Sequence, residues 1–118
     1  MKRILVCEDE LDAQASIKNM LTRRNYEVFS ASDGQAAIEQ ARELKPDVVL
    51  LDIRMPKIDG IEVAREIRTF DKLMKIIVVT AFASPEIQKE ISRYGVSEYI
   101  VKPASADSIV TALESALK

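Results

Sequence analysis

Apolar residues follow two alternating patterns along this chain. Short unbroken aliphatic runs are typical of strands buried on both faces, whereas apolar residues that return every three or four positions indicate one face of a helix. The runs predict strands at 3–7, 26–31, 47–53, 75–81 and 98–102. The helical pattern predicts a helix after each strand, beginning with the segment 11–25.

Residues suited to helix ends support these boundaries. Asp59 and Ser105 stand where N-caps are expected, because their side chains can accept hydrogen bonds from the first backbone N–H groups. Ser84 is followed by Pro85, which is favoured at the first helical position. Gly95 suits a left-handed C-terminal cap, so the fourth helix is predicted to end near it.

Five strands that alternate with five helices predict an α/β fold of the (βα)5 type. Right-handed crossovers then give a doubly wound, five-stranded parallel sheet with helices on both faces. The 118 residues are the length of one ordinary domain, and no repeat or linker divides them, so we expect a single domain over 1–118. In such sheets ligands bind outside the carboxyl ends of the strands.

The composition excludes several classes of function. Hydrophobic residues make up 47% of the chain and charged residues 31%, with no apolar run long enough to cross a bilayer, so no membrane partner is expected. A net charge of −2 and 5% aromatic residues argue against direct binding of nucleic acid. Histidine is absent, which removes histidine-based nucleophiles and histidine-ligated metals. The single cysteine, Cys7, fits a small apolar residue of the first strand and a reducing, cytoplasmic compartment.

Polar residues stand at the carboxyl ends of four predicted strands. They are Glu8 and Asp9 in the first, Asp52 in the third, Thr80 in the fourth and Lys102 in the fifth. Because parallel strands end at the same edge of a sheet, we expect these side chains to meet. Three acids in one place repel one another unless a cation neutralises them, and oxygen ligands alone select a hard ion such as Mg²⁺.

A carboxylate beside such an ion can attack phosphorus and form an acyl phosphate. Lys102 and Thr80 would then meet the phosphoryl oxygens as a charge and a hydrogen-bond donor. Each residue alone also has an ordinary interpretation: Glu8 and Asp9 as a turn that caps the first helix, Thr80 as a strand residue, Lys102 as a solvated lysine. Asp52 is different, because a charge that ends a core strand needs a partner or water. The combination on four strands favours a functional site.

Over its whole length the sequence resembles the receiver domain of bacterial two-component response regulators. The resemblance lies in the stretches ILVCEDE, PDVVLLDIRMPKIDGIEVAREIR, IIVVTAFAS and YGVSEYIVKP, and in their order and spacing. It implies the flavodoxin-like receiver fold with strand order 2-1-3-4-5. It also implies signal transduction by a phosphorylation switch, which catalyses only its own phosphorylation and dephosphorylation and is not otherwise an enzyme.

By this resemblance Asp52 is the phosphoacceptor. The implied Mg²⁺ ligands are Asp9, Asp52 and the backbone carbonyl of Arg54, with Glu8 acting through a water molecule. Glu8 stands where aspartate is more frequent in the family, which keeps the negative charge. Arg54 and Phe82 are expected to flank the phosphoryl group and to influence how fast water removes it.

The resemblance further implies a conformational switch. Thr80 matches the hydroxyl that moves to the phosphoryl group, Tyr99 the aromatic residue that rotates inward, and Lys102 the lysine on the phosphoryl oxygens. The Lys102–Pro103 peptide bond is expected to be cis. Phosphorylation adds about −1.5 to −2 charges, and contacts with them would favour one of two states. Without the resemblance, Tyr99 is equally a half-buried strand residue with a solvated hydroxyl.

The implied phosphoryl donor is a sensor histidine kinase or a histidine phosphotransfer protein. Because this chain has no histidine, the donor is another molecule or a small acyl phosphate. Leu11 and Ala15, on the first helix beside the acidic residues, can dock an apolar patch of a helical donor, or can be scattered surface residues. Output would pass through the fourth helix, fifth strand and fifth helix to an unidentified partner. The protein would be a monomer or a phosphorylation-dependent dimer.

Two alternatives belong to other functional classes. A pseudo-receiver would dock partners without being phosphorylated, and would need none of the acidic, hydroxyl and lysine groups found here. A Mg²⁺-dependent phosphohydrolase would act on outside substrates, but it usually needs a second acid two residues after the nucleophile, where this chain has Arg54. The sequence also leaves open a stand-alone regulator or a receiver cut from a longer protein.

Overall fold

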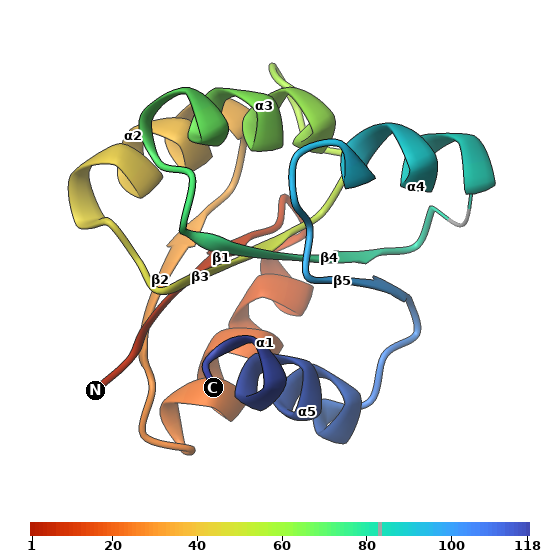
Figure 1. The fold of residues 1–118 in the computed structure, drawn as a ribbon. Helices are drawn as coiled ribbons and strands as arrows, with labels where there is room; N and C mark the ends of the chain where they lie inside the picture. Colours follow the sequence, from red (N-terminus) through yellow and green to blue (C-terminus); the bar gives the residue numbers. More distant parts are fainter. Residues whose placement is uncertain (83) are drawn as a thin grey trace.

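The structure is a computed structural model, and it describes residues 1–82 and 84–118. Strands and helices alternate along the chain (Figure 1). The strands are β1 (Arg3–Cys7), β2 (Glu27–Ala31), β3 (Val48–Leu51), β4 (Lys75–Thr80) and β5 (Glu98–Val101). The helices are α1 (Leu11–Thr22), α2 (Gly34–Leu44), α3 (Gly60–Phe70), α4 (Pro85–Ser92) and α5 (Ala106–Ala116). None of these described helices has the length and apolar character needed to cross a membrane.

The strands form one parallel sheet in the order β2-β1-β3-β4-β5. Helices α1 and α5 lie on one face of this sheet, and α2, α3 and α4 lie on the other (Figure 1). The predicted (βα)5 architecture and the implied strand order are therefore confirmed.

The central strand β3 explains the unbroken apolar runs in the sequence. All four of its residues are buried. Val49 and Leu51 pack into the core under α2, α3 and α4, whereas Val48 and Leu50 pack into the core under α1 and α5. Because alternate residues of a strand point to opposite faces, a strand covered on both sides needs an apolar residue at every position. Cys7 is buried in β1, as predicted.

The predicted helix starts are confirmed. Asp59, Ser84 and Ser105 each accept a hydrogen bond from the backbone N–H three residues later, and Pro85 is the first residue of α4. Gly95 has the expected left-handed conformation, with φ of 71°. It lies beyond the helix end, however, because α4 already ends at Ser92.

Other predicted boundaries were too long. The segment 11–25 is helical only to Thr22, and the chain then turns through Asn25, whose φ of 69° is left-handed. Asparagine tolerates that conformation better than most residues, which suits it to ending a helix. The predicted strand 47–53 is reduced to Val48–Leu51. The carboxylate of Asp47 accepts a hydrogen bond from the backbone N–H of Arg3 at 2.8 Å, outside the strand ladder.

The core under α2, α3 and α4 should be sensitive to loss of volume at Ile76, which is 0% exposed in β4. We expect Ile76→Ala to lower the free energy of unfolding by about 3 kcal/mol, since it removes buried methyl groups and leaves a cavity. Leu73, 86% exposed in the preceding loop, provides the control. Urea denaturation should show Leu73→Ala within about 0.5 kcal/mol of wild type. Equal losses in both variants would contradict this description of the core.

Candidate functional site

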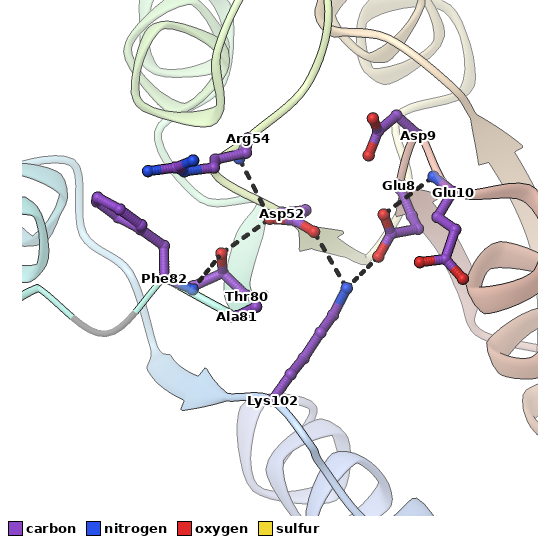
Figure 2. A pocket seen from close by; sticks show the side chains of 9 residues that line it. All are labelled: Glu8, Asp9, Glu10, Asp52, Arg54, Thr80, Ala81, Phe82 and Lys102. Atoms are coloured by element: carbon purple, nitrogen blue, oxygen red, sulfur yellow. Dashed lines mark hydrogen bonds and ion pairs between the residues drawn. The ribbon is translucent and has the colours of Figure 1, made fainter.

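Side chains from four strands converge at the carboxyl edge of the sheet (Figure 2). Glu8 and Asp52 directly follow β1 and β3, Thr80 ends β4, and Lys102 directly follows β5. The parallel register aligns these ends: the last residues of β1 and β3 are paired, as are Thr80 and the last residue of β5. The backbone pairing of the sheet thus brings together groups that are as many as 94 residues apart in the sequence.

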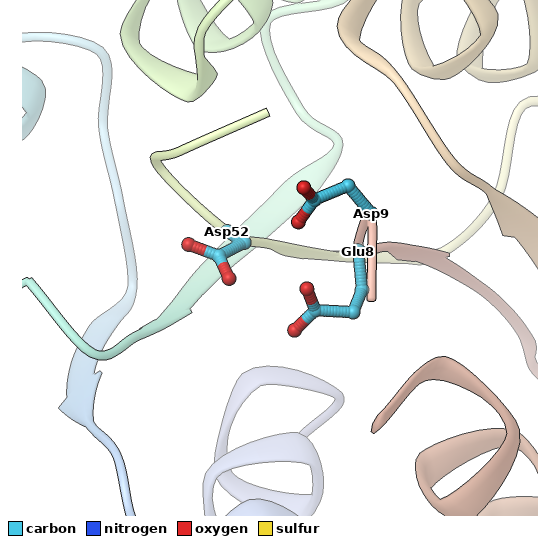
Figure 3. Close-up of side chains that lie close together, drawn as sticks. All are labelled: Glu8, Asp9 and Asp52. Carbon is cyan, nitrogen blue, oxygen red and sulfur yellow. The ribbon is translucent and has the colours of Figure 1, made fainter. Parts of the chain in front are cut away.

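Three carboxylates form the acidic part of this site. Glu8, Asp9 and Asp52 each offer an oxygen within 4.8 Å of the others (Figure 3). Glu8 and Asp52 are only 3% and 8% exposed, whereas Asp9 is exposed. The interpretation of Glu8 and Asp9 as a cap for α1 is not supported, because the N-cap is Glu10 and has no side-chain capping bond. Glu8 instead accepts a hydrogen bond from the backbone N–H of Glu10 at 3.2 Å.

These carboxylates fit the hard cation that the sequence implied. Mg²⁺ prefers oxygen ligands and keeps several waters, so it usually takes only one or two protein carboxylates, and this cluster offers three. No histidine exists in the chain to favour a transition metal. The Cys7 thiol is buried within β1, and burial raises its pKa, so it is not available as a thiolate ligand.

Asp52 has a separate partner for each side of its carboxylate. Its Oδ1 accepts a hydrogen bond from the Thr80 hydroxyl at 2.8 Å and another from the backbone N–H of Arg54 at 3.2 Å. Its Oδ2 lies 3.1 Å from the Lys102 ammonium. The ammonium also donates to Glu8, so a single positive charge is shared by two buried acids (Figure 2).

The pKa values of Lys102 and Glu8 reflect a competition between burial and their mutual hydrogen bond. Burial lowers the pKa of Lys102, but its hydrogen bonds to Glu8 and Asp52 outweigh burial, so the net shift is upward. Burial raises the pKa of Glu8, and the hydrogen bond from Lys102 offsets this only in part. A simple ion pair would lower the pKa of the acid. The opposite direction at Glu8 reflects its burial and, to a lesser extent, the charge of Asp52. Added positive charge nearby would lower the pKa of Glu8 and so oppose both causes.

The acidic residues line an open pocket of about 670 Å³. Its other wall is formed by Arg54 and Phe82, where the guanidinium carbon lies 4.0 Å from the centre of the phenyl ring. This stacked pair extends beside Asp52 and Thr80 (Figure 2). A group bound to Asp52 would therefore lie between the ammonium of Lys102 and the stacked guanidinium.

Tyr99 does not line the pocket but is connected to it by hydrogen bonds. Its hydroxyl donates a hydrogen bond to the backbone carbonyl of Phe82 at 2.7 Å. The backbone N–H of Phe82 donates to the Thr80 hydroxyl at 3.2 Å, and that hydroxyl donates to Asp52. Burial, and secondarily the charge of Asp52, raise the pKa of Tyr99. Tyr99 is half-buried, which its ordinary interpretation also expected, and its hydroxyl is bonded to the backbone of the pocket wall.

The structure brings together the residues that the sequence singled out at the strand ends: Glu8, Asp9, Asp52, Thr80 and Lys102. The Lys102–Pro103 peptide bond is cis. Sequence reasoning did not find the bond between Lys102 and Glu8, nor the acceptor of the Tyr99 hydroxyl. The first has a sequence signal, since glutamate in place of aspartate at position 8 has one methylene more with which to reach the lysine. The second is a backbone carbonyl, which leaves no signal in the sequence.

A family model for the response regulator receiver domain matches residues 4–114. The chain belongs to this family. Among curated relatives, the chemotaxis protein CheY of Thermotoga maritima is 36% identical over 99% of this chain and 98% of its own length. The transcriptional regulatory protein PdtaR of Mycobacterium tuberculosis is 37% identical over 98% of this chain, but this chain spans only 57% of that protein. Receiver domains thus occur both nearly alone and as parts of longer regulators.

Solved structures agree with this assignment. A CheY-like receiver domain from Methanospirillum hungatei has a TM-score of 0.96 at 27% identity, over 99% of this chain and 94% of that one. The response regulator TrrA of Thermotoga maritima, solved in complex with Mg(2+)-BeF, has a TM-score of 0.88 at 36% identity, over 98% of this chain and 99% of that one. The receiver domain is thus a signalling module of two-component systems, with an acidic pocket suited to a phosphoacceptor.

Removal of the shared ammonium should destabilise this receiver domain. We expect Lys102→Met to lower the free energy of unfolding by about 2 kcal/mol in metal-free buffer, because it leaves buried carboxylates without a counter-charge at a partly solvated site. Saturating Mg²⁺ should recover part of the loss, since a ligand of the native state stabilises it. The measurement is urea denaturation with and without Mg²⁺. Lys18→Met, at an exposed position of α1, serves as the control, and an equally small effect of both substitutions would contradict the prediction.

Proposed function

We propose that this receiver domain accepts a phosphoryl group on Asp52 in a Mg²⁺-dependent reaction, and that this modification switches its output face. The observation that carries the proposal is the placement of Asp52. It is a buried carboxylate at the base of an open pocket, with two further acids beside it, the Thr80 hydroxyl on one of its oxygens and the Lys102 ammonium on the other. The similar TrrA structure, a complex with Mg(2+)-BeF, supports the role of the metal in this family.

The residues that would hold Mg²⁺ are Asp9, Asp52 and the backbone carbonyl of Arg54, with Glu8 acting through a water molecule. When bound, the ion would offset the charge that builds up on the transferring phosphoryl oxygens. The carboxylates would also lose their mutual repulsion, which is greatest where Glu8 and Asp52 are buried side by side. Asp9 is exposed and so can meet a hydrated ion that enters from the solvent.

In the reaction, an oxygen of Asp52 would attack the phosphorus of a phosphohistidine on a sensor kinase or phosphotransfer protein. The new P–O bond forms as the P–N bond breaks, and the imidazole leaves with the electron pair and takes up a proton. The product is an acyl phosphate on Asp52. Lys102 and Thr80 already contact the two oxygens of this carboxylate, so they lie beside the place where the phosphoryl oxygens would be.

The same pocket would govern loss of the phosphoryl group by hydrolysis. The water must approach the phosphorus opposite Asp52, along the space bordered by Arg54 and Phe82. This stacked pair narrows the approach and offers a guanidinium that can hold a phosphoryl oxygen. The receiver would then catalyse its own phosphorylation and dephosphorylation and no reaction on outside substrates.

The switch would follow the hydrogen-bonded connection from Asp52 through Thr80 and Phe82 to Tyr99. A phosphoryl group on Asp52 would draw the Thr80 hydroxyl to one of its oxygens, and the inward position of Tyr99 would be favoured. Since Tyr99 belongs to β5, the change reaches the face formed by α4, β5 and α5, where an output partner or a second copy would bind. Val101, also on β5, is an exposed apolar residue of this face.

The donor would be a sensor histidine kinase or a histidine phosphotransfer protein that this receiver meets in the cytoplasm. It would be another molecule, because the chain itself lacks histidine. Leu11, 66% exposed at the start of α1, and the exposed Ala15 offer apolar surface close to the pocket residue Glu10. An apolar helix face of the donor could cover them as its phosphohistidine enters the pocket.

Intact mass spectrometry after incubation with acetyl phosphate tests the proposed function. We expect the wild-type mass to increase by one phosphoryl group in the presence of Mg²⁺ and to stay unchanged in EDTA. Asp52→Asn should take up none, because an amide oxygen is a poor nucleophile toward phosphorus. Asp47→Asn, at the opposite end of β3, is the matched control and should retain the adduct. An adduct that persists in Asp52→Asn would assign the acceptor to another residue, and no adduct with any donor would favour a pseudo-receiver.

A further inference from the structure

The loop from 53 to 59, between β3 and α3, carries the Arg54 carbonyl and therefore one of the proposed Mg²⁺ ligands. It has few backbone hydrogen bonds of its own. At the base of the loop, the backbone N–H of Gly60 donates a hydrogen bond to the carbonyl of Ile53 at 2.7 Å. At the tip, the backbone N–H of Ile58 donates to the carbonyl of Pro56 at 2.8 Å. Lys57 at this tip has a φ of 71°, a left-handed conformation that costs energy for a lysine. Something outside the loop must hold the tip in place.

The first residue of α2 lies directly against that tip. The backbone N–H of Gly34 donates to the carbonyl of Pro56 at 3.3 Å. A Cβ added to Gly34 would lie 1.9 Å from the carbonyl oxygen of Ile58 and 2.7 Å from its Cβ. Both distances are far below van der Waals contact, so only glycine allows α2 and the loop to approach so closely. Gly34 does not have a positive φ. Glycine is therefore required here by the close approach of the loop and not by the backbone conformation.

The preceding residue adds a second contact to the same tip. Asp33 is the N-cap of α2, and its Oδ1 accepts a hydrogen bond from the backbone N–H of Ala36 at 2.8 Å. Its Oδ2 lies 3.4 Å from the ammonium of Lys57. One side chain therefore both starts α2 and holds the strained residue of the loop. The start of α2 and the loop tip thus form one unit, made of a close backbone contact and an ion pair.

We propose that Gly34, assisted by Asp33, is a positioning residue for the Mg²⁺ site. It fixes the Pro56–Ile58 tip, and the tip fixes the direction in which the Arg54 carbonyl points, two residues away along the same loop. Neither Gly34 nor Asp33 lines the pocket that holds the carboxylates, so both act only through the loop. This inference rests on the proposed function, because it concerns the metal that the proposed reaction needs.

The test is the Mg²⁺ affinity of Gly34→Ala, measured by isothermal titration calorimetry. The added methyl group must push the loop tip away, and we expect affinity to fall about tenfold, the size of effect seen when residues that support metal ligands are lost. The rate of phosphorylation by acetyl phosphate should fall at low Mg²⁺ and return to the wild-type maximum at saturating Mg²⁺. Asp33→Asn keeps the capping oxygen but removes the charge, so its affinity should fall only about twofold.

Gly95→Ala is the matched control. Gly95 has a φ of 71°, so alanine there is strained, yet the nearest atoms to its new Cβ are those of the Arg68 side chain at 3.7 Å. This variant should lose stability without loss of Mg²⁺ affinity, which separates general destabilisation from an effect on the site. Mg²⁺ affinity of Gly34→Ala within about twofold of wild type would overturn the inference. A wild-type protein that binds no Mg²⁺ would overturn it together with the proposed function.

A second measurement covers the case in which Gly34→Ala does not fold. In the wild-type protein, hydrogen exchange of the Gly34 amide reports its bond to Pro56, and by linkage Mg²⁺ binding should slow that exchange about fivefold or more. The amide of Lys45, bonded to Ala41 at the far end of α2, serves as the reference and should not change. Equal changes at both amides, or none at Gly34, would contradict the inference.

Discussion

One ammonium group, that of Lys102, is shared by two buried carboxylates, and the geometry of the site depends on this sharing. Glu8 and Asp52 would repel each other in a poorly solvated place if Lys102 did not lie between them. With Asp9 included, three clustered acids share the Lys102 ammonium, and even with the Arg54 guanidinium on the opposite wall the acids that line the pocket outnumber its bases. That excess suits a divalent cation, and under the proposed function such a cation would let the site accept a phosphoryl group. The imbalance is therefore the feature that prepares the site for its chemistry.

The parallel sheet brings these charged groups together and connects the pocket to the rest of the molecule. Its register places the ends of β1, β3, β4 and β5 together, and each end contributes one part of the pocket. The loops that follow the strands then connect the pocket to the rest of the molecule in two directions. Through Thr80, Phe82 and Tyr99 the site reaches β5 and the proposed output face. Through the loop 53–59 it is supported by the start of α2.

Much of the fold and of the strand-end site could be predicted from the sequence, because strands and helix starts have local signals. The unbroken run Val48–Leu51 predicted a strand buried on both faces, and capping residues such as Asp59 predicted helix starts. Parallel topology then predicted that the strand-end residues meet. The longer side chain of glutamate at position 8 was the one signal for its bond with Lys102, but that signal alone did not decide it, because the contact depends on where both side chains lie in three dimensions. Asp33 before Gly34 was a usable capping signal that the pattern analysis did not use. The contact of Gly34 with Ile58 joins the first residue of α2 to the loop before α3, and nothing local in the sequence marks it.

The central claim is that Asp52, beside a bound cation, holds a phosphoryl group that Lys102 and Thr80 contact. Fluorine NMR with beryllofluoride, a non-hydrolysing mimic of the phosphoryl group, tests it most directly because no hydrolysis can hide the complex. The account predicts bound fluorine resonances in the wild-type protein that require Mg²⁺, are absent in Asp52→Asn, and are shifted in Thr80→Ala and Lys102→Met. If wild-type protein with saturating Mg²⁺ shows only free beryllofluoride, or if Asp52→Asn still binds it, Asp52 is not the phosphoacceptor.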